Sequence, residues 1–459
     1  ITKDMEREQL GSRLGFILLS AGCAIGLGNI WKFPYMVDQN GGGIFVLIYL
    51  LFLLTLGAPV LCMEFAMGRA SKKSPVKMYD ELEPRGSKWH MHGYVAMAGC
   101  YILMMFYTVV AGWMIKYFIS SATGDLSGLD SVGVENAFGD MLADPVTMIL
   151  LTSIVVIMGF LVCSFGVKNS LERITKAMMI VLLALMIVLA IHSFTMAGAS
   201  EGLSFYLKPD VDKFLEAGVG NVIIAAMSQA FFTLSIGMGS MAIFGSYIND
   251  DRTLFGEAVT VGVLDTFVAF TAGLIIFPAC FTYGISVDAG PSLIFITLPN
   301  VFNSLPMGEL WGTMFFIFMS FAALSTVFAV FEAIIACTMD LTGWGRKKAS
   351  LINCIAMLIL VLPCIFGFNI LSDFQPLGPG TGILDLEDFI VSYIILPFGA
   401  LLFTIFCATR YGWGWDNFVN EANKGKGLKV QKWMRPYVTY VLPVAIAILL
   451  VSGIVLSFV

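Results

Sequence analysis

The sequence predicts an all-α polytopic membrane protein. Of its 459 residues, 58% are hydrophobic and only 13% are charged, and its mean hydropathy is +0.86, a balance that is unusual for a water-soluble globular chain. Apolar runs of roughly 20 residues, the length that crosses a hydrocarbon core, recur along the whole chain with short polar connections. We therefore expect a single integral membrane domain.

Eleven transmembrane helices are predicted from these runs. They cover residues 14–38, 43–68, 91–120, 145–164, 170–196, 216–247, 255–283, 309–340, 349–368, 387–411 and 433–458. Residues 1–13 are polar, so we expect a cytoplasmic N-terminal segment there and no cleavable signal peptide. The spans divide into a first block of five over 14–196, a second block of five over 216–411 and a last span over 433–459.

The distribution of positive charge predicts the orientation of these spans. Of the 26 lysines and arginines, only Lys208 and Lys213 fall in the loops that face away from the N-terminus, and Lys32 and Lys116 lie within spans near that side. Because basic loops stay in the cytoplasm, the N-terminus is predicted to be cytoplasmic and the C-terminus outside. Short outer loops and the absence of any N-x-S/T sequon favour a bacterial inner membrane. The net charge of −6 fits a solvated surface, so nucleic acid is not an expected partner.

Cysteine and histidine usage points to no cofactor site. All nine cysteines fall in or beside apolar segments without a CxxC pattern, so neither a disulfide framework nor a zinc site is predicted. Two of the three histidines, His90 and His92, lie beside basic residues at the end of a span. No constellation of nucleophile, base and orienting group is present in the spans. We expect no organic cofactor and no enzymatic activity.

Two spans carry helix-breaking residues in the middle of their apolar length. The first contains "AGCAIGLGNIWKFPY", in which three glycines surround Asn29, and the sixth contains "FFTLSIGMGS". In lipid, an interrupted helix is tolerated only where it is buried in protein or lines a wet cavity. Both breaks open a block of five spans, and because five is odd the second block must cross the membrane with the opposite polarity. Paired broken helices in an inverted repeat are typical of a secondary transporter with its site near the midplane.

A simpler interpretation of the first break is helix packing. Gly22 and Gly26 form a GxxxG pattern, which is more often a contact face than a binding site. That interpretation leaves unexplained Asn29, the second break, and Asp265 in the middle of the seventh span. A carboxylate there is either a proton site, the partner of a lysine or a cation ligand. We favour the cation ligand, because Asn29, Thr233 and Asp265 offer the oxygen atoms that a hard cation such as Na⁺ prefers.

At these residues the sequence resembles the neurotransmitter:sodium symporter family over essentially its full length, and in particular the bacterial amino-acid transporters of that family. The resemblance is carried by "GSRLGFILLSAGCAIGLGNIWKFPY", "NGGGIF", "SQAFFTLSIGMG" and "FAALSTVFAV", in this order and spacing. It implies the LeuT-type fold, with a 5+5 inverted repeat and discontinuous first and sixth helices. It also implies amino-acid uptake driven by the sodium gradient, in a protein that is a monomer or a weak homodimer.

The resemblance implies two sodium sites. The first takes the carbonyl of Ala24, the side chain of Asn29, the carbonyl and hydroxyl of Thr233, and Asp265, and the substrate carboxylate completes it. The second takes the carbonyls of Gly22, Ile25 and Ala322 and the hydroxyls of Ser325 and Thr326. Without the resemblance, Ser325 and Thr326 would be interpreted as bonding back to the preceding turn of their helix. Since Asp265 supplies a carboxylate at the first site, transport is predicted not to require chloride.

The resemblance also implies the substrate site. It comprises the backbone from Cys23 to Gly28 (with Ala24 and Gly26), the hydroxyls of Tyr107 and Ser235, Thr233, and an apolar pocket of Leu103, Phe232, Met238 and Val330, with Phe232 as the lid. Gly26 replaces the aspartate of monoamine carriers, so the expected substrate has its own carboxylate. Met238 replaces an aromatic residue on the pocket wall, which favours large hydrophobic or aromatic amino acids, because methionine is flexible and contacts rings well.

Two gates are implied in the same way. On the inside, Arg7 and Asp340 form an ion pair, with Tyr247 and Ser246 nearby. On the outside, Asp388 pairs with Lys32, which replaces the usual arginine and lacks its bidentate fork. Leu10 stands where relatives commonly have tryptophan. The predicted function is a sodium-coupled symporter of hydrophobic amino acids that works by alternating access. The alternatives are a carrier of a different small amino acid, or a channel or receptor-like binding protein on the same scaffold.

Overall fold

The computed structural model describes residues 8–285, 287 and 290–456. This part of the chain consists of helices and connecting loops, with two isolated β-bridges and no strand. Nine of its helical segments are long and apolar enough to cross a membrane, and two further helix pairs pass the same test together but are bent at a short break. The predicted spans agree with these segments to within a few residues at most ends.

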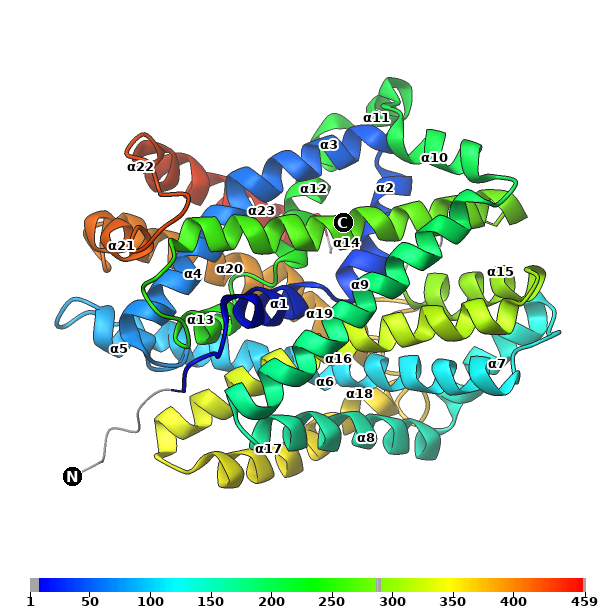
Figure 1. Cartoon of the computed structure of the whole chain (residues 1–459), viewed down its shortest axis with the longest axis horizontal. Coiled ribbons are helices and arrows are strands. Elements are labelled where there is room, and N and C mark those ends of the chain that lie inside the picture. Colours follow the sequence, from blue (N-terminus) through cyan, green and yellow to red (C-terminus); the bar gives the residue numbers. More distant parts are fainter. Residues whose placement is uncertain (1–7, 286, 288–289, 457–459) are drawn as a thin grey trace.

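Some spans are long continuous helices and others are built from two shorter ones (Figure 1). In the first half they are α1 (Arg13–Ala24) with α2 (Phe33–Gln39), α3 (Gly43–Phe52) with α4 (Ala58–Ser71), α6 (His90–Thr123), α8 (Pro145–Ser164) and α9 (Glu172–Phe194). In the second half they are α12 (Val219–Thr233) with α13 (Ser240–Gly245), α14 (Leu254–Tyr283), α16 (Gly308–Thr342), α17 (Arg346–Leu360) with α18 (Leu362–Phe366), α19 (Ile383–Phe389) with α20 (Leu396–Ala408), and α22 (Met434–Pro436) with α23 (Leu442–Leu456).

Short helices that the hydropathy pattern did not predict occupy the connections. They are α5 (Met78–Leu82), α7 (Ser131–Ala143), α10 (Ala199–Leu207), α11 (Val211–Ala217), α15 (Leu298–Ser304) and α21 (Trp415–Ala422). One of them, α11, is bent by 90° relative to α12. The sixth span therefore begins at Val219, slightly later than predicted, and its predicted break lies beyond the end of α12.

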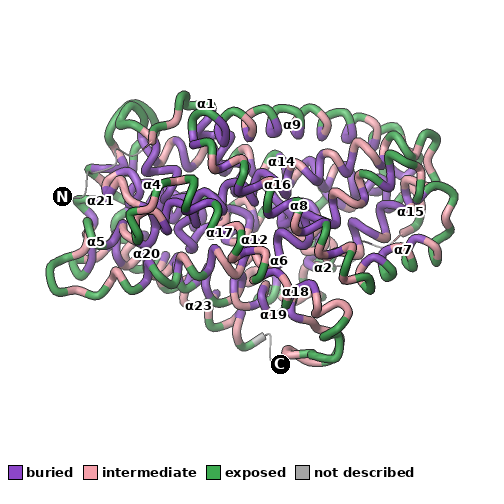
Figure 2. Tube along the Cα trace, turned by 90° about the horizontal axis from the view of Figure 1, so that it is seen from below, coloured by how far each residue is buried: buried purple, intermediate pink, exposed green. Residues whose placement is uncertain are grey.

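Helix α16 lies at the centre of the bundle, where it packs along α6 and also contacts α1, α8 and α9. Its most apolar window is 83% buried, whereas that of the last span is 28% buried. Peripheral helices instead expose apolar stripes, as α8 does with Leu150, Ile154, Ile157 and Leu161. Figure 2 shows the buried residues concentrated inside and the exposed ones along outer helices such as α9. Apolar exposure of this kind is expected where helices face lipid.

The described residues contain six short π-helical segments, and five of them lead into a proline. The segments are Gly28–Lys32, Leu53–Gly57, Val167–Leu171, Leu293–Thr297, Ile390–Ile395 and Tyr437–Val441, and all but Val167–Leu171 are followed by a residue and then proline. Proline has no N–H to donate to the carbonyl four residues earlier, and a wider turn is one way to accommodate that loss. Before Pro59, that carbonyl belongs to Thr55, and the hydroxyl of Tyr437 donates to it over 2.6 Å. This bond joins the second span to the last.

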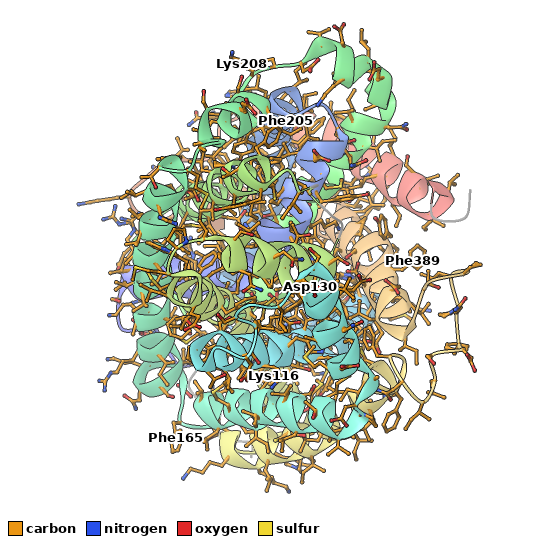
Figure 3. All side chains as sticks on the ribbon, turned by 90° about the vertical axis from the view of Figure 1, so that its right-hand side faces the viewer. Lys116, Asp130, Phe165, Phe205, Lys208 and Phe389 are labelled. Atoms are coloured by element: carbon orange, nitrogen blue, oxygen red, sulfur yellow. The ribbon has the colours of Figure 1, made fainter. Side chains whose placement is uncertain are left out.

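The two ends of the bundle differ in character. Figure 1 places residues 8–12, α5 and α21 at one end, and α7, α10 and α15 at the other. We call the first the basic end, because most of the loop lysines and arginines lie in its connections. Figure 3 faces the opposite end, where Asp130 and Lys208 lie.

Candidate functional site

The first break lies in the centre of the bundle. Helix α1 ends at Ala24, and helical structure resumes at Gly28 after a bend of 58°. Ile25 between them is extended, with φ −69° and ψ 108°. Because the intrahelical hydrogen-bond pattern stops here, backbone groups of residues 22–28 become available to neighbouring helices.

The second break separates α12 from α13. Thr233 ends α12, Ser240 begins α13, and Ser235, Gly237 and Gly239 between them have positive φ. The fully buried Glu64 of α4 accepts a hydrogen bond from the amide of Gly237 at 2.5 Å. Glu64 thus holds the break against α4. Glu64 was not predicted as a functional residue, although a carboxylate within an apolar span is itself a signal of function.

Three polar side chains meet between the breaks. Asp265 accepts hydrogen bonds from the amide nitrogen of Asn29 at 2.8 Å and from the hydroxyl of Thr233 at 2.7 Å, and Asn29 and Thr233 are 3.1 Å apart. All three are buried. The oxygen of Asn29 accepts from the amide of Gly26 at 3.1 Å. The structure therefore brings together three of the four residues predicted for the first sodium, and Ala24 lines the adjacent cavity.

A second group of oxygens lies between α1 and α16. The hydroxyl of Ser325 lies 3.0 Å from the carbonyl oxygen of Gly22 and 2.9 Å from that of Ala322. The hydroxyl of Thr326 lies 3.1 Å from the carbonyl oxygen of Gly22 and 3.2 Å from that of Ile25. All five residues predicted for the second sodium thus converge, and the two hydroxyls reach across to another helix in addition to bonding within their own.

A small cavity lies beside both groups. Its volume is about 30 Å³, room for no more than a few water molecules. The residues predicted for the pocket that line it are Cys23, Ala24, Gly26, Gly28, Leu103, Tyr107, Phe232, Thr233, Ser235 and Met238. Leu27 lies within the predicted backbone stretch from Cys23 to Gly28, whereas Thr326, Val391 and Leu396 were not predicted for the pocket. A Cβ atom on Gly26 would collide with the hydroxyl of Tyr107, so a residue without a side chain is needed there.

One residue predicted for this pocket does not line it. Val330 is fully buried in α16 but is not part of the cavity wall. It lies one helical turn beyond Thr326, which does line the cavity. The apolar wall is instead completed by Val391 and Leu396, which come from the α19 to α20 span.

The predicted ion pair between Lys32 and Asp388 is not formed. The ammonium of Lys32 lies 4.0 Å from the centre of the Phe232 ring and 5.8 Å from that of Tyr393. The carboxylate of Asp388 accepts from the hydroxyl of Ser392 at 2.7 Å. In this structure Phe232 instead offers the ammonium an aromatic face at close range, and a lysine lacks the fork that favours a planar pairing with a carboxylate.

Replacing Lys32 by methionine removes this contact while keeping a long side chain. Because a cation–π contact contributes about 0.5 to 2 kcal/mol, we expect bound substrate to dissociate about two- to thirtyfold faster. The dissociation rate of labelled substrate from the purified protein measures this. Lys208→Met, at the end of the bundle opposite the basic end, is the matched control. Equal dissociation rates in both variants would show that the contact of Lys32 with Phe232 does not retain the substrate.

At the basic end, the predicted gate is only partly visible. Arg7 lies outside the described residues, and Asp340 accepts from the amide of Ser74 at 2.7 Å. The hydroxyl of Tyr247 donates to Glu332, a buried carboxylate that also pairs with Arg346 at 2.7 Å. Sequence reasoning missed Glu332 and Arg346. Glu332 is a carboxylate in an apolar span, and its presence in "FEAIIAC" was the available signal.

Comparison with known proteins agrees with this architecture. The model of the "Sodium:neurotransmitter symporter family" matches residues 7–131 and 132–458. An uncharacterised sodium-dependent transporter of Bacillus subtilis, YhdH, is 34% identical over 98% of both chains. GABA transporter 2 of mouse, described as sodium- and chloride-dependent, is 26% identical over 90% of this chain and 75% of its own. The crystal structure of MhsT in complex with L-phenylalanine superposes with a TM-score of 0.87 at 37% identity, covering 97% of this chain and 100% of that one.

These likenesses, with the paired breaks and the oxygen-rich groups beside them, define a membrane transporter with the LeuT-type fold. The chain belongs to the sodium:neurotransmitter symporter family. It is a sodium-dependent symporter of a small-molecule substrate rather than an enzyme.

Proposed function

We propose that the protein takes up hydrophobic, bulky or aromatic α-amino acids together with two sodium ions. The observation that supports this best is the position of the two oxygen-rich groups, Asn29–Thr233–Asp265 and Gly22–Ile25–Ala322–Ser325–Thr326, beside one mainly apolar cavity. Oxygen ligands suit hard cations, and the amide ends of broken helices favour an anionic group. The substrate carboxylate would lie beside Gly26 and complete the first sodium site.

Uptake by proteoliposomes tests this function. Labelled L-tryptophan or L-leucine should accumulate inside only when sodium is imposed as an inward gradient, because coupled transport draws on that gradient. A flux that does not depend on the sodium gradient would favour a channel, and sodium-dependent binding without transport would favour a receptor-like protein. Either result would contradict the proposal.

The size of the cavity bears on the substrate. An amino acid needs far more than about 30 Å³, so Met238 and Phe232 in its wall must move to admit one. Met238 is fully buried and unbranched, and a methionine yields to a large ring more easily than an aromatic residue does. MhsT was crystallised with L-phenylalanine, which supports the same class of substrate for this chain.

Met238→Phe should shift the preference towards smaller side chains. A stiffer and larger ring narrows the pocket, and one misfitting group typically changes discrimination by about 10- to 200-fold. We expect the affinity for tryptophan to fall by about tenfold or more relative to that for alanine. Competition against one labelled substrate measures the profile, and Met91→Phe, at an exposed position, is the control. An unchanged profile would show that Met238 does not filter size.

The orientation and ion dependence follow from charge. We place the basic end in the cytoplasm and the opposite end outside, as expected for a bacterial inner membrane protein. Asp265 supplies a negative charge within the first sodium site, so uptake should persist when chloride is replaced by gluconate. A loss of uptake in gluconate would mean that an anion is required in addition to Asp265.

A further inference from the structure

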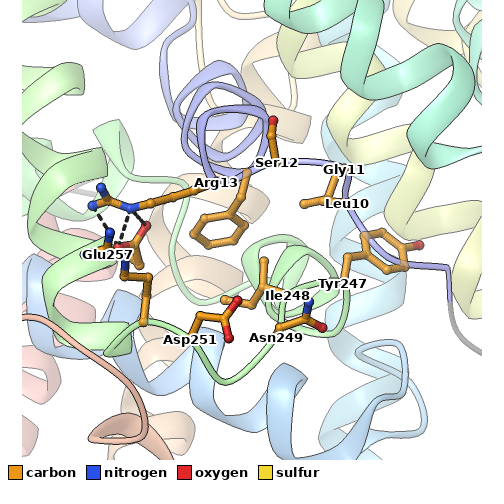
Figure 4. Close-up of a pocket in the computed structure, with 11 residues that line it drawn as sticks. Leu10, Gly11, Ser12, Arg13, Tyr247, Ile248, Asn249, Asp251 and Glu257 are labelled. Atoms are coloured by element: carbon orange, nitrogen blue, oxygen red, sulfur yellow. Dashed lines mark hydrogen bonds and ion pairs between the residues drawn. The ribbon is translucent and has the colours of Figure 1, made fainter.

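A second, larger cavity lies at the basic end, away from the paired breaks. Its volume is about 370 Å³, within the range of pockets that hold small ligands, whereas the cavity between the breaks measures about 30 Å³. One wall is the N-terminal segment with the start of α1, residues 10–16, and the other is the linker 247–252 with Glu257 of α14. Figure 4 shows these two walls facing each other.

Hydrogen bonds hold the two walls in place. At one side Arg13 bridges to Glu257, with its Nε and Nη2 atoms each 3.0 Å from Oε1 (Figure 4). At the other, the amide of Leu10 donates to the carbonyl of Tyr247 at 3.1 Å. The buried Glu172 of α9 accepts from the amide of Gly11 at 2.6 Å. The cavity is therefore framed by fixed backbone rather than by a loose loop.

The lining combines an apolar side with opposite charges. Leu10, Phe16 and Ile248 supply the apolar side. Glu257 is already matched by Arg13, but the side chains of Asp251 and Arg252 make no ion pair with any residue in the described part of the chain.

The backbone beneath these two charges is anchored. The carbonyl of Arg252 accepts from the fully buried Arg69 at 2.8 Å, and that of Asp251 accepts from the amide of Lys426 at 2.9 Å. A carboxylate and a guanidinium on adjacent, anchored residues thus border an apolar surface. This combination matches a small molecule that carries both charges and an apolar group.

We propose that this cavity binds one zwitterionic amino acid with an apolar side chain. Its carboxylate lies at Arg252, its ammonium group at Asp251, and its side chain against Leu10, Phe16 and Ile248. The ligand belongs to the class that the protein delivers to this side of the membrane, so the assignment of the ligand rests on the proposed function. Because it contacts both walls, the bound amino acid holds the N-terminal segment against the linker 247–252. Accumulated product thereby slows further uptake.

Equilibrium binding to the purified full chain tests this site. Labelled L-leucine is measured in sodium chloride and in choline chloride, because the two oxygen-rich groups proposed to hold sodium lie beside the site between the breaks. We expect one component that requires sodium and a second that persists in choline. In the double variant Asp251→Asn, Arg252→Gln, the affinity of the choline component should fall by at least about tenfold, while the sodium-dependent component is unchanged.

Two further variants of the chain test whether the binding in choline belongs to this cavity. Ile248→Trp fills the cavity without changing its charge and should also remove the choline component. Asp416→Asn with Lys347→Gln changes two exposed charges at the same end outside the cavity and should leave it intact. If binding in choline is absent, or is the same in all variants, the second site is refuted. Loss of the sodium-dependent component in the unmodified protein would instead refute the proposed function, so the two failures are distinguishable.

Discussion

Replacing Asp265 by asparagine is expected to abolish sodium-dependent substrate binding while the protein stays folded. Asparagine has the same shape, but it removes the negative charge from a buried group that Asn29 and Thr233 approach at 2.8 and 2.7 Å. Changes around metal ligands cost roughly 10- to 100-fold in affinity, and loss of a charged ligand should cost at least the upper figure. Sodium titration of labelled substrate binding measures it.

The same variant has a second expected property that separates function from folding. A buried carboxylate costs free energy unless it is paired, so in sodium-free buffer Asp265→Asn should unfold at a temperature no lower than the unmodified protein. Glu201→Gln, at an exposed acid in α10, is the matched control for charge. If the variant keeps its sodium affinity, Asp265 is not a ligand.

The second large effect is expected from Gly399→Ala, which adds a single methyl group. Gly399 of α20 packs directly on Gly237 in the second break, and a Cβ atom there would overlap the Gly237 carbonyl. Gly237 is held in place, because its own amide is bonded to Glu64, and it packs just as closely on the backbone of Leu396 in the same helix α20. Overpacking against fixed backbone costs about 3 kcal/mol at the upper end of its usual range.

Thermal unfolding and the monodisperse fraction on size exclusion measure the effect of Gly399→Ala. We expect a clear fall in both, together with weaker substrate binding, since Met238 follows Gly237 directly. Gly262→Ala is the matched control, because the same change in the interior of α14 meets no atom within 4 Å. There, alanine favours the helix by up to about 1 kcal/mol. Equal stability of the two variants would mean that the break tolerates movement against α20.

The spans and their breaks were predictable because they depend on local sequence. Hydropathy over roughly 20 residues locates a span, and glycine with asparagine in the middle of one marks a break. The short helices α7, α10 and α21 were missed, since they are too short to leave a transmembrane signal.

Contacts between distant residues were harder to predict. The contact of Lys32 with Phe232 was not predicted, because the sequence does not show that this ring lies 4.0 Å from the ammonium. Val330 was placed in the pocket although the adjacent turn of α16 lines it instead. Glu64 is 173 residues away from its partner Gly237. Glu332 is 85 residues away from Tyr247 and 14 residues away from Arg346. A single sequence carries no signal for such separations.

The hydrogen bond from Tyr437 to the carbonyl of Thr55 has a consequence for assembly during synthesis. Pro59 removes the amide that normally pairs with this carbonyl in an α-helix, and the hydroxyl that bonds to it belongs to the last span, 382 residues later. Until translation reaches Tyr437, the carbonyl lacks this donor, at a cost in free energy. The last span therefore supplies a hydrogen bond to the second span, which is inserted early in synthesis. Chains that end before residue 437 should yield little stable protein.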